Sequence, residues 1–301
     1  MININKLNVF IVYYCLDMLA ESLSLFTALC YGLSSVLIRK GVRNSNAFTG
    51  TFIAALVQVL VMSGLLALFS PKEIIWTGIA FFVASGILAS ALGRLCNYSS
   101  IELLGVPMTA SIIGSSPLFS IVFAMLLLGE EVTIGIVFGT VLVVAGVALT
   151  SCISRRSLRL SRAFAFPILA AAFYGASSSF RKLGLQVLPE PILGTLVGAL
   201  STLAFLCGYL ALGKNRCRID KQRSCIGYFL GSGIIVSLGW LSMFAALLFG
   251  KVSVVSALIG TNPLFSLLFS LLFLRGSDTV NRRVAMGCVA VVVGATIITL
   301  N

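Results

Sequence analysis

The chain has 301 residues, of which 59% are apolar and 10% charged, whereas about 25% of residues are charged in a typical soluble domain. Several apolar runs reach the ~20 residues that a helix needs to cross a bilayer, so the composition excludes a soluble protein and predicts an all-α integral membrane protein. The net charge of +12 does not indicate nucleic-acid binding, because most of the 21 Lys and Arg lie between apolar runs, where they act as orientation signals. We expect the lipid bilayer as a partner and no nucleic acid.

The residues needed for metal or enzymatic chemistry are not gathered anywhere in the sequence. The chain has no histidine, its eight cysteines are spread singly, and its few carboxylates form no cluster. Metal-ligand spacing and acid–base pairs are therefore missing. We expect no metal, no cofactor and no enzymatic activity.

The first twenty residues differ from the rest of the chain. An apolar run over Leu7–Leu16 is interrupted by Asp17 before it is long enough to span, and no small-residue cleavage site follows convincingly. We interpret residues 1–20 as an N-terminal extension or a misassigned start, with Met18 as the alternative initiator.

Ten apolar spans come after this segment, separated by charged residues, proline and glycine. They form two sets of five, which we predict as two domains, residues 21–152 and 163–301. The predicted spans lie near residues 22–38, 47–69, 74–99, 107–128, 132–152, 163–182, 190–212, 226–249, 252–274 and 283–300.

The two sets of spans are copies of each other. The stretch Ile113–Leu128, IGSSPLFSIVFAMLLL, recurs as Ile259–Leu274, IGTNPLFSLLFSLLFL. Each copy carries a proline near its start, which tends to kink a helix where other protein re-satisfies the freed carbonyl, so we predict Pro117 and Pro263 as hinges.

The start of each set is repeated as well: Tyr31 begins a Tyr-Gly-x-Ser-Ser motif that recurs at Tyr174. Since each set holds an odd number of spans, the second set enters the membrane with the opposite orientation. The sequence thus predicts ten transmembrane helices as two inverted five-helix repeats, with a substrate site near the midplane. The positive-inside rule predicts both termini on the outer side.

These motifs resemble the EamA family of the drug/metabolite transporter superfamily. The resemblance rests on the fourth-span pattern Ser111 to Phe119 with its central Pro117, on Leu128-Gly129-Glu130, on the glycines of the fifth span at Gly139 and Gly146, and on repetition of the whole unit. It covers nearly everything from about residue 20 onward. It implies a ten-helix carrier that exports or exchanges amino acids, metabolites, nucleotide sugars or drugs through a central cavity, with the fifth and tenth helices peripheral.

The sequence departs from this family pattern at one place. The glutamate at Glu130 in the first half has no counterpart in the second, where Leu274 is followed by Arg275-Gly276-Ser277-Asp278. We predict a gating role for Glu130, with a solvated loop charge as the alternative. If that carboxylate acts in gating, the two halves are functionally unequal.

Arg94 is the strongest candidate for a substrate-binding residue, because a charge inside a span costs several kcal/mol unless it is paired or faces water. It lies about two turns inside the third span, and we predict its equivalent in the second half, Trp240, as a substrate-binding residue too. Arg94 suits an anionic or carboxylate-bearing substrate; the alternative is a snorkelling or Glu102-paired structural arginine. Asn97, on the same helix face, and Tyr98 are further candidates, although polar groups also join membrane helices.

The remaining candidates come in pairs from the two halves. Tyr and Ser at positions i and i+3 share a helix face, which suits a cavity wall, with small-residue helix packing as the alternative for the serines. Residues just before the two prolines suit a cavity because carbonyls are freed beside them. The pairs are Tyr31 and Ser34 with Tyr174 and Ser177, and Ser116 with Asn262.

Together these features predict a secondary transporter of the inner membrane that exports or exchanges small polar metabolites, such as amino acids, by alternating access. The sequence has no Walker-type phosphate loop, so energy would come from exchange or an ion gradient. The alternatives are a membrane pore and a carrier of anionic or nucleotide-linked metabolites. Small-xxx-small motifs such as Gly135-x-x-x-Gly139 permit close contact within the chain, so we expect a monomer or weak homodimer.

Overall fold

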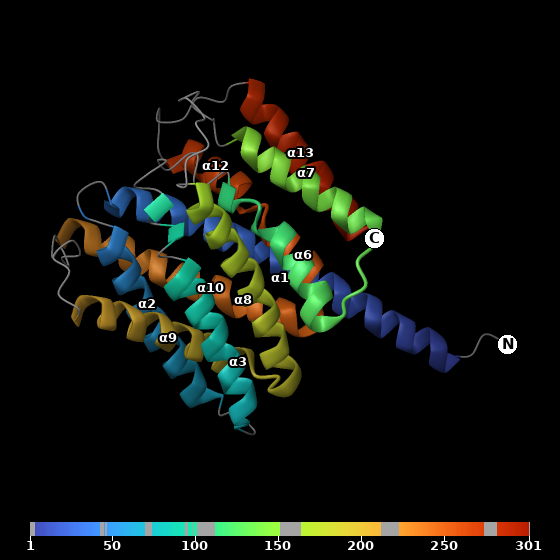
Figure 1. Ribbon diagram of the computed structural model, residues 1–301, viewed down its shortest axis with the longest axis horizontal. Coiled ribbons are helices and arrows are strands. Elements are labelled where there is room, and N and C mark those ends of the chain that lie inside the picture. The colour runs from blue at the N-terminus through green and yellow to red at the C-terminus, as the bar shows by residue number, and fades with distance from the viewer. Residues whose placement is uncertain are drawn as a thin grey trace.

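The computed structural model describes residues 4–42, 45, 47–69, 74–93, 96–97, 99–100, 112–150, 164–211, 223–273 and 282–300. Every regular element among these residues is helical (Figure 1). The first half contains α1 (Ile4–Val42), α2 (Ala47–Leu68), α3 (Trp76–Gly86), which continues as a π-helical segment (η1, Ile87–Gly93), α6 (Ser116–Leu128) and α7 (Ile134–Thr150). The second half contains α8 (Ala165–Val187), α9 (Pro191–Ala211), α10 (Arg223–Phe249), α11 (Val252–Ile259), α12 (Asn262–Phe273) and α13 (Arg282–Thr299).

The described helices have the lengths and surfaces of membrane spans. Four of them contain stretches long and apolar enough to cross a bilayer, Cys15–Ile38, Phe48–Leu68, Pro191–Ala211 and Cys225–Phe249, and shorter apolar helices accompany them. Large apolar side chains also cover the outside of the bundle, as at Leu126, which is 74% exposed. Such a surface is suited to lipid rather than water.

The two prolines of the repeated stretch begin helices rather than kink them. Pro117 lies in the first turn of α6, and Pro263 is the second residue of α12, which follows a turn at Gly260-Thr261. The first-turn backbone nitrogens of a helix have no intrahelical partner, so proline removes no hydrogen bond there. The expected kink is therefore a helix break, and the predicted ninth span is two helices, α11 and α12.

The repeated motifs of one half pack against those of the other. A methyl group added to Gly32 on α1 would lie 2.6 Å from Cβ of Phe265 on α12, and one added to Gly175 on α8 would lie 2.7 Å from Cβ of Phe119 on α6. Backbone atoms of the facing helix lie equally close in both cases. Each Tyr-Gly motif thus fits against the Pro-Leu-Phe-Ser segment of the opposite half, and only glycine allows so close an approach.

A second pair of exchanged contacts involves phenylalanine. Phe229 on α10 lies against Gly41 and Gly50 of the first half, whereas Phe82 on α3 lies against Gly184 and Gly194 of the second. The same contact is therefore made twice with the halves interchanged. The core is consequently shared between the two halves.

Helices α7 and α13 form a pair along one side of the bundle (Figure 1). Their backbones touch at glycine: a methyl group added to Gly139 would lie 2.7 Å from the carbonyl oxygen of Gly294, and one added to Gly146 would lie 2.6 Å from that of Gly287. This pair comprises the last helix of each half. Because this pair lies along one side, the other helices form the centre of the bundle.

Helix α1 is longer than the first predicted span. It runs without interruption from Ile4 to Val42. Residues 4–20, predicted as part of a separate extension, continue the first helix in the structure.

Candidate functional site

A cavity of about 240 Å³ lies between the two halves, where the Tyr-Gly motifs meet the starts of α6 and α12. Both halves contribute to its wall, and most of its polar groups are hydroxyls. Its lining residues are Tyr31, Ala89, Ser116, Pro117, Ser120, Tyr174, Ser178, Arg181, Trp240, Met243, Ser256, Ile259, Gly260 and Asn262.

The helix breaks position the middle of this wall. Gly260, in the turn before α12, lies against Pro117 at the start of α6, since a methyl group added to Gly260 would be 2.9 Å from Cγ of Pro117. The residues at the two breaks, Ser116 and Asn262, therefore line one space. The duplicated stretch supplies this part of the cavity from both halves.

Five of the residues predicted to bind substrate line the cavity: Tyr31, Ser116, Tyr174, Trp240 and Asn262. The predicted hinge Pro117 lines it too. Asn97 is not among the lining residues. Arg94, Tyr98 and the side chain of Pro263 lie outside the described residues.

The predicted serines Ser34 and Ser177 hold helices together instead of lining the cavity. The hydroxyls of Ser34 and Ser232 lie 2.8 Å apart and link α1 to α10, whereas the hydroxyl of Ser177 donates to the carbonyl oxygen of Ser85 at 3.1 Å and links α8 to α3. Both side chains are buried. Of the two alternatives for these serines, their placement favours helix packing.

Replacing Ser34 by alanine should lower the free energy of unfolding by about 1 kcal/mol, because Ser232 loses its partner inside the bundle. Ser35→Ala is the matched control: the Ser35 hydroxyl is exposed and donates only to the carbonyl of Tyr31 in its own helix, so its loss should change stability by less than about 0.5 kcal/mol. Thermal unfolding in detergent measures both. Substrate affinity altered by Ser34→Ala at unchanged stability would contradict the packing role.

Arg181 is a cavity residue that the sequence analysis did not single out. Its side chain is 6% exposed, its Nη1 donates to Sδ of Met243 at 3.5 Å, and its guanidinium carbon lies 5.1 Å from the ring centroid of Trp240 and 5.8 Å from that of Phe244. The hydroxyl of Tyr31 donates to the same sulfur at 3.6 Å. One methionine thus joins the tyrosine of the first half to the arginine of the second.

Arg181 has no carboxylate partner in the described part of the chain. A thioether is a weak acceptor, and Nε is buried without a hydrogen-bond partner. The contacts with Trp240 and Phe244 contribute about 0.5–2 kcal/mol each, less than the several kcal/mol that burial of an unpaired charge costs. The guanidinium is therefore incompletely neutralised by its described surroundings.

Arg181 was not predicted because it stands one residue before the end of the predicted sixth span, 163–182, a position where charges usually mark a span boundary. Helix α8 continues to Val187, which puts Arg181 inside it. A usable signal was present: Tyr174, Ser178 and Arg181 follow one another at i, i+4 and i+7, the spacing of a single helix face. The repeat register also sets Arg181 against Ile38, so the charge belongs to one half only.

An apolar cluster closes the cavity toward the end of the bundle where α8 and α10 finish. It consists of Phe82, Leu185, Leu188, Phe244, Leu247 and their buried neighbours, and the rings of Phe82 and Phe244 meet edge to face with centroids 5.7 Å apart. We call it the closing cluster. It follows Arg181 and Trp240 along the two helices, and Trp240 packs against it.

Beyond the closing cluster, two charged side chains bind backbone groups at the end of α10 and the start of α11. Lys182 Nζ donates to the carbonyl oxygens of Leu247 (2.6 Å), Leu248 (3.4 Å) and Gly250 (2.9 Å) at the end of α10. The carboxylate of Glu130 accepts from the backbone nitrogens of Val252 (2.7 Å) and Ser253 (3.1 Å), and from the Ser253 hydroxyl (2.9 Å). These contacts satisfy free carbonyls at one helix end and free N–H groups at the next helix start.

The position of Glu130 depends on the glycine before it. Gly129 ends α6 with φ 64°, a left-handed conformation that glycine adopts without strain. The turn carries Glu130 from the first half to α11 of the second. In this Leu-Gly-Glu motif, Gly129 thus ends α6 and Glu130 caps the start of α11.

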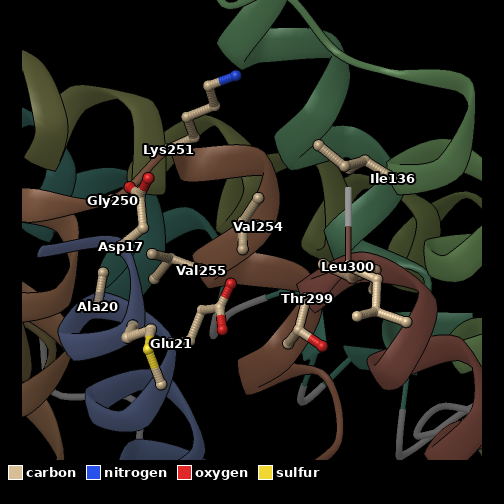
Figure 2. Close-up of a pocket in the computed structure, with 12 residues that line it drawn as sticks. Asp17, Ala20, Glu21, Ile136, Gly250, Lys251, Val254, Val255, Thr299 and Leu300 are labelled. Carbon is tan, nitrogen blue, oxygen red and sulfur yellow. The ribbon is translucent and has the colours of Figure 1, made fainter. Parts of the chain in front are cut away.

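A second cavity, of about 310 Å³, lies between α1 and the C-terminal end of α13 (Figure 2). Figure 2 shows Asp17 and Glu21 of α1 on one side and Thr299 and Leu300 on the other. Asp17 and Lys251 are exposed. The recess therefore resembles a solvated surface and lacks the buried polar groups of the cavity between the halves.

Two relatives of known sequence each match less than half of the chain. The uncharacterized protein MJ1333.1 of Methanocaldococcus jannaschii is 28% identical over 136 residues, which cover 44% of this chain and 93% of that protein. The uncharacterized protein PA1977 of Pseudomonas aeruginosa is 32% identical over 127 residues, 42% of this chain and 44% of that protein.

The fold and the family are shown by two further comparisons. A solved crystal structure superposes with a TM-score of 0.78 over 93% of this chain and 96% of that one, at 16% identity, a likeness that concerns the fold alone. The family model of the EamA-like transporter family matches residues 18–152 and 162–300, one match for each half. The chain therefore belongs to the EamA-like transporter family.

Proposed function

We propose that the protein is a secondary carrier of small polar metabolites that works by alternating access, with ten membrane spans arranged as two inverted five-helix repeats. The single observation that carries this proposal is the cavity between the halves, to which both repeats contribute Tyr31 and Tyr174, Ser116 and Asn262. A site at the interface of two inverted repeats can face either side of the membrane as the repeats rock.

The exchanged glycine contacts support the rocking mechanism. Gly32 and Gly175 let the first helix of each half lie against the helix that follows the break in the other half. Such smooth contacts allow helices to slide and tilt with few side-chain obstructions. The proposed hinges Pro117 and Pro263 lie two residues before Phe119 and Phe265, the phenylalanines of the glycine contacts, where α6 and α12 begin.

The closing cluster gives the proposed cycle a gate. Opening this end requires the rings of Phe82 and Phe244 to separate and the end of α10 to leave Lys182. Glu130 then acts as part of the gate, because it holds the start of α11. The cluster also argues against a permanently open pore, which needs a continuous polar path.

Transport by the purified protein in liposomes tests this proposal. Liposomes loaded with an unlabelled mixture of amino acids and small organic acids are diluted into labelled members of the same mixture. A carrier should show uptake that saturates with concentration and accelerates several-fold when substrate is present on the opposite side. Uptake that rises linearly and ignores the opposite side would indicate a pore and refute the proposal. Membrane fractionation checks the proposed location in the inner membrane. The mass of the protein–detergent complex checks the proposed oligomeric state, a monomer or weak homodimer.

A further inference from the structure

We infer that Arg181 is the anion-binding group of the cavity, and that the substrate is a small organic monoanion whose carboxylate pairs with its guanidinium. This inference rests on the proposed carrier function and specifies what it carries. It begins from a buried cation that lines the cavity while one of its nitrogens, Nε, has no hydrogen-bond partner.

The geometry at Arg181 suits a carboxylate from the cavity. The side chain is held by the rings of Trp240 and Phe244 and by the sulfur of Met243, contacts that fix the plane of the guanidinium but leave most of its five N–H groups unused. A planar guanidinium held in this way pairs with a carboxylate through two parallel hydrogen bonds. The incoming anion would supply the partner that the described chain does not.

The charge of the site favours one negative charge over two. Arg181 is the single cation among the described lining residues. The neighbouring Lys182 is engaged with carbonyl oxygens at the end of α10, so it does not contribute its charge to the cavity. A monocarboxylate would leave the loaded site neutral, whereas a dianionic phosphate would leave an unpaired negative charge in the membrane.

The rest of the wall suits the body of such a molecule. Tyr31, Tyr174 and Trp240 offer apolar surface with polar edges, and Ser116, Ser256 and Asn262 offer hydrogen bonds away from the charge. The cavity volume of about 240 Å³ limits the substrate to a small molecule. We therefore expect a hydroxy or aromatic monocarboxylate.

Tryptophan fluorescence tests the inference directly. The chain has two tryptophans, Trp76 and Trp240, and Trp76 is 78% exposed at the start of α3. Trp76→Phe therefore leaves Trp240, next to Arg181, as the reporter. The purified Trp76→Phe protein is titrated with matched pairs of a monoanion and its neutral amide, lactate and lactamide, benzoate and benzamide, and with methyl phosphate.

The expected result is saturable quenching by at least one carboxylate and at least about 30-fold weaker binding of its amide. Arg181→Gln should abolish this difference, and Arg181→Lys, which keeps the charge but not the fork, should weaken carboxylate binding several-fold. Lys40→Gln is the control, because it removes a cation that lies over Tyr228 and Phe273, outside the cavity, and should change nothing. If Arg181→Gln fails to fold, the comparison of acid with amide on the Trp76→Phe protein still decides.

Other outcomes separate the inference from the proposed function. Equal binding of acid and amide, tighter binding of methyl phosphate, or no quenching by any carboxylate up to about 10 mM would overturn the inference. If liposome exchange persists in those cases, the carrier function stands without it. Saturable, Arg181-dependent carboxylate binding in a protein that exchanges nothing across liposomes would support the anion site and refute the carrier.

Discussion

Replacing Gly175 by alanine is expected to lower the free energy of unfolding by about 2 kcal/mol and to slow transport. The new methyl group would lie 2.7 Å from Cβ of Phe119 and 2.7 Å from the backbone nitrogen of Ser120, so α8 and α6 must separate. Overpacking of this kind costs about 1–3 kcal/mol, and a backbone atom cannot rotate away as a side chain can. Ser120 also lines the cavity, so the displacement reaches the site itself.

The chain contains matched controls for this substitution. Gly64 on α2 and Gly208 on α9 have no atom within 4 Å of an added methyl group. Alanine there should raise stability by up to about 1 kcal/mol, because it favours the helix without a clash. Gly32→Ala, the counterpart in the first half, should behave like Gly175→Ala. Thermal unfolding in detergent measures all four, and a Gly175→Ala protein as stable as Gly208→Ala would contradict the close contact between the halves.

Lys182→Met is expected to lower the free energy of unfolding by about 2–4 kcal/mol and to open the end of the bundle that the closing cluster seals. The substitution removes a charged donor from three carbonyl oxygens and leaves the end of α10 without a cap. If about 1.4 kcal/mol of this loss falls on the closed state alone, the open population rises tenfold.

Thiol labelling measures that population. Leu185, in the closing cluster, is 1% exposed, so Leu185→Cys should react with a water-soluble maleimide only when this end opens. Labelling should be about tenfold faster in the Lys182→Met background than with Lys182 present, and Glu130→Gln should have a smaller effect of the same sign, because it keeps one oxygen acceptor. Lys40→Met controls for the loss of a cation. Unchanged labelling with a lowered melting temperature would make Lys182 a stabilising residue without a part in gating.

The division of the chain into two halves could be predicted from the sequence because its motifs are repeated. The duplicated stretch, the Tyr-Gly motif and the spacing of apolar runs predicted two equivalent halves, and the family match to each half agrees with this. What no single motif could indicate is its partner. That Gly32 lies on Phe265 and Gly175 on Phe119 depends on how the halves interlock, and so on contacts between residues far apart in the chain.

The site was predictable to the extent that it is symmetric. Tyr31, Tyr174, Ser116 and Asn262 were identified as pairs and line the cavity, but identical spacing also selected Ser34 and Ser177, which face neighbouring helices. Periodicity assigns a residue to a helix face but not that face to a cavity. Arg181 was missed because it stands at the predicted end of its span, and span boundaries cannot be placed to within a turn from apolar content alone.

The unpaired charge of Arg181 has a consequence for the energetics of the transport cycle. An empty site carries a net positive charge, and exposing that charge first to one side of the membrane and then to the other is equivalent to moving it through part of the membrane potential. A full unit charge costs about 2.3 kcal/mol per 100 mV. A bound monoanion cancels this charge, so the loaded protein reorients electroneutrally and the membrane potential acts only on the empty one. A membrane that is negative inside draws the empty, positively charged site inward and opposes its outward movement, so a protein built in this way would favour net export of the anion over its net uptake, without any coupling ion.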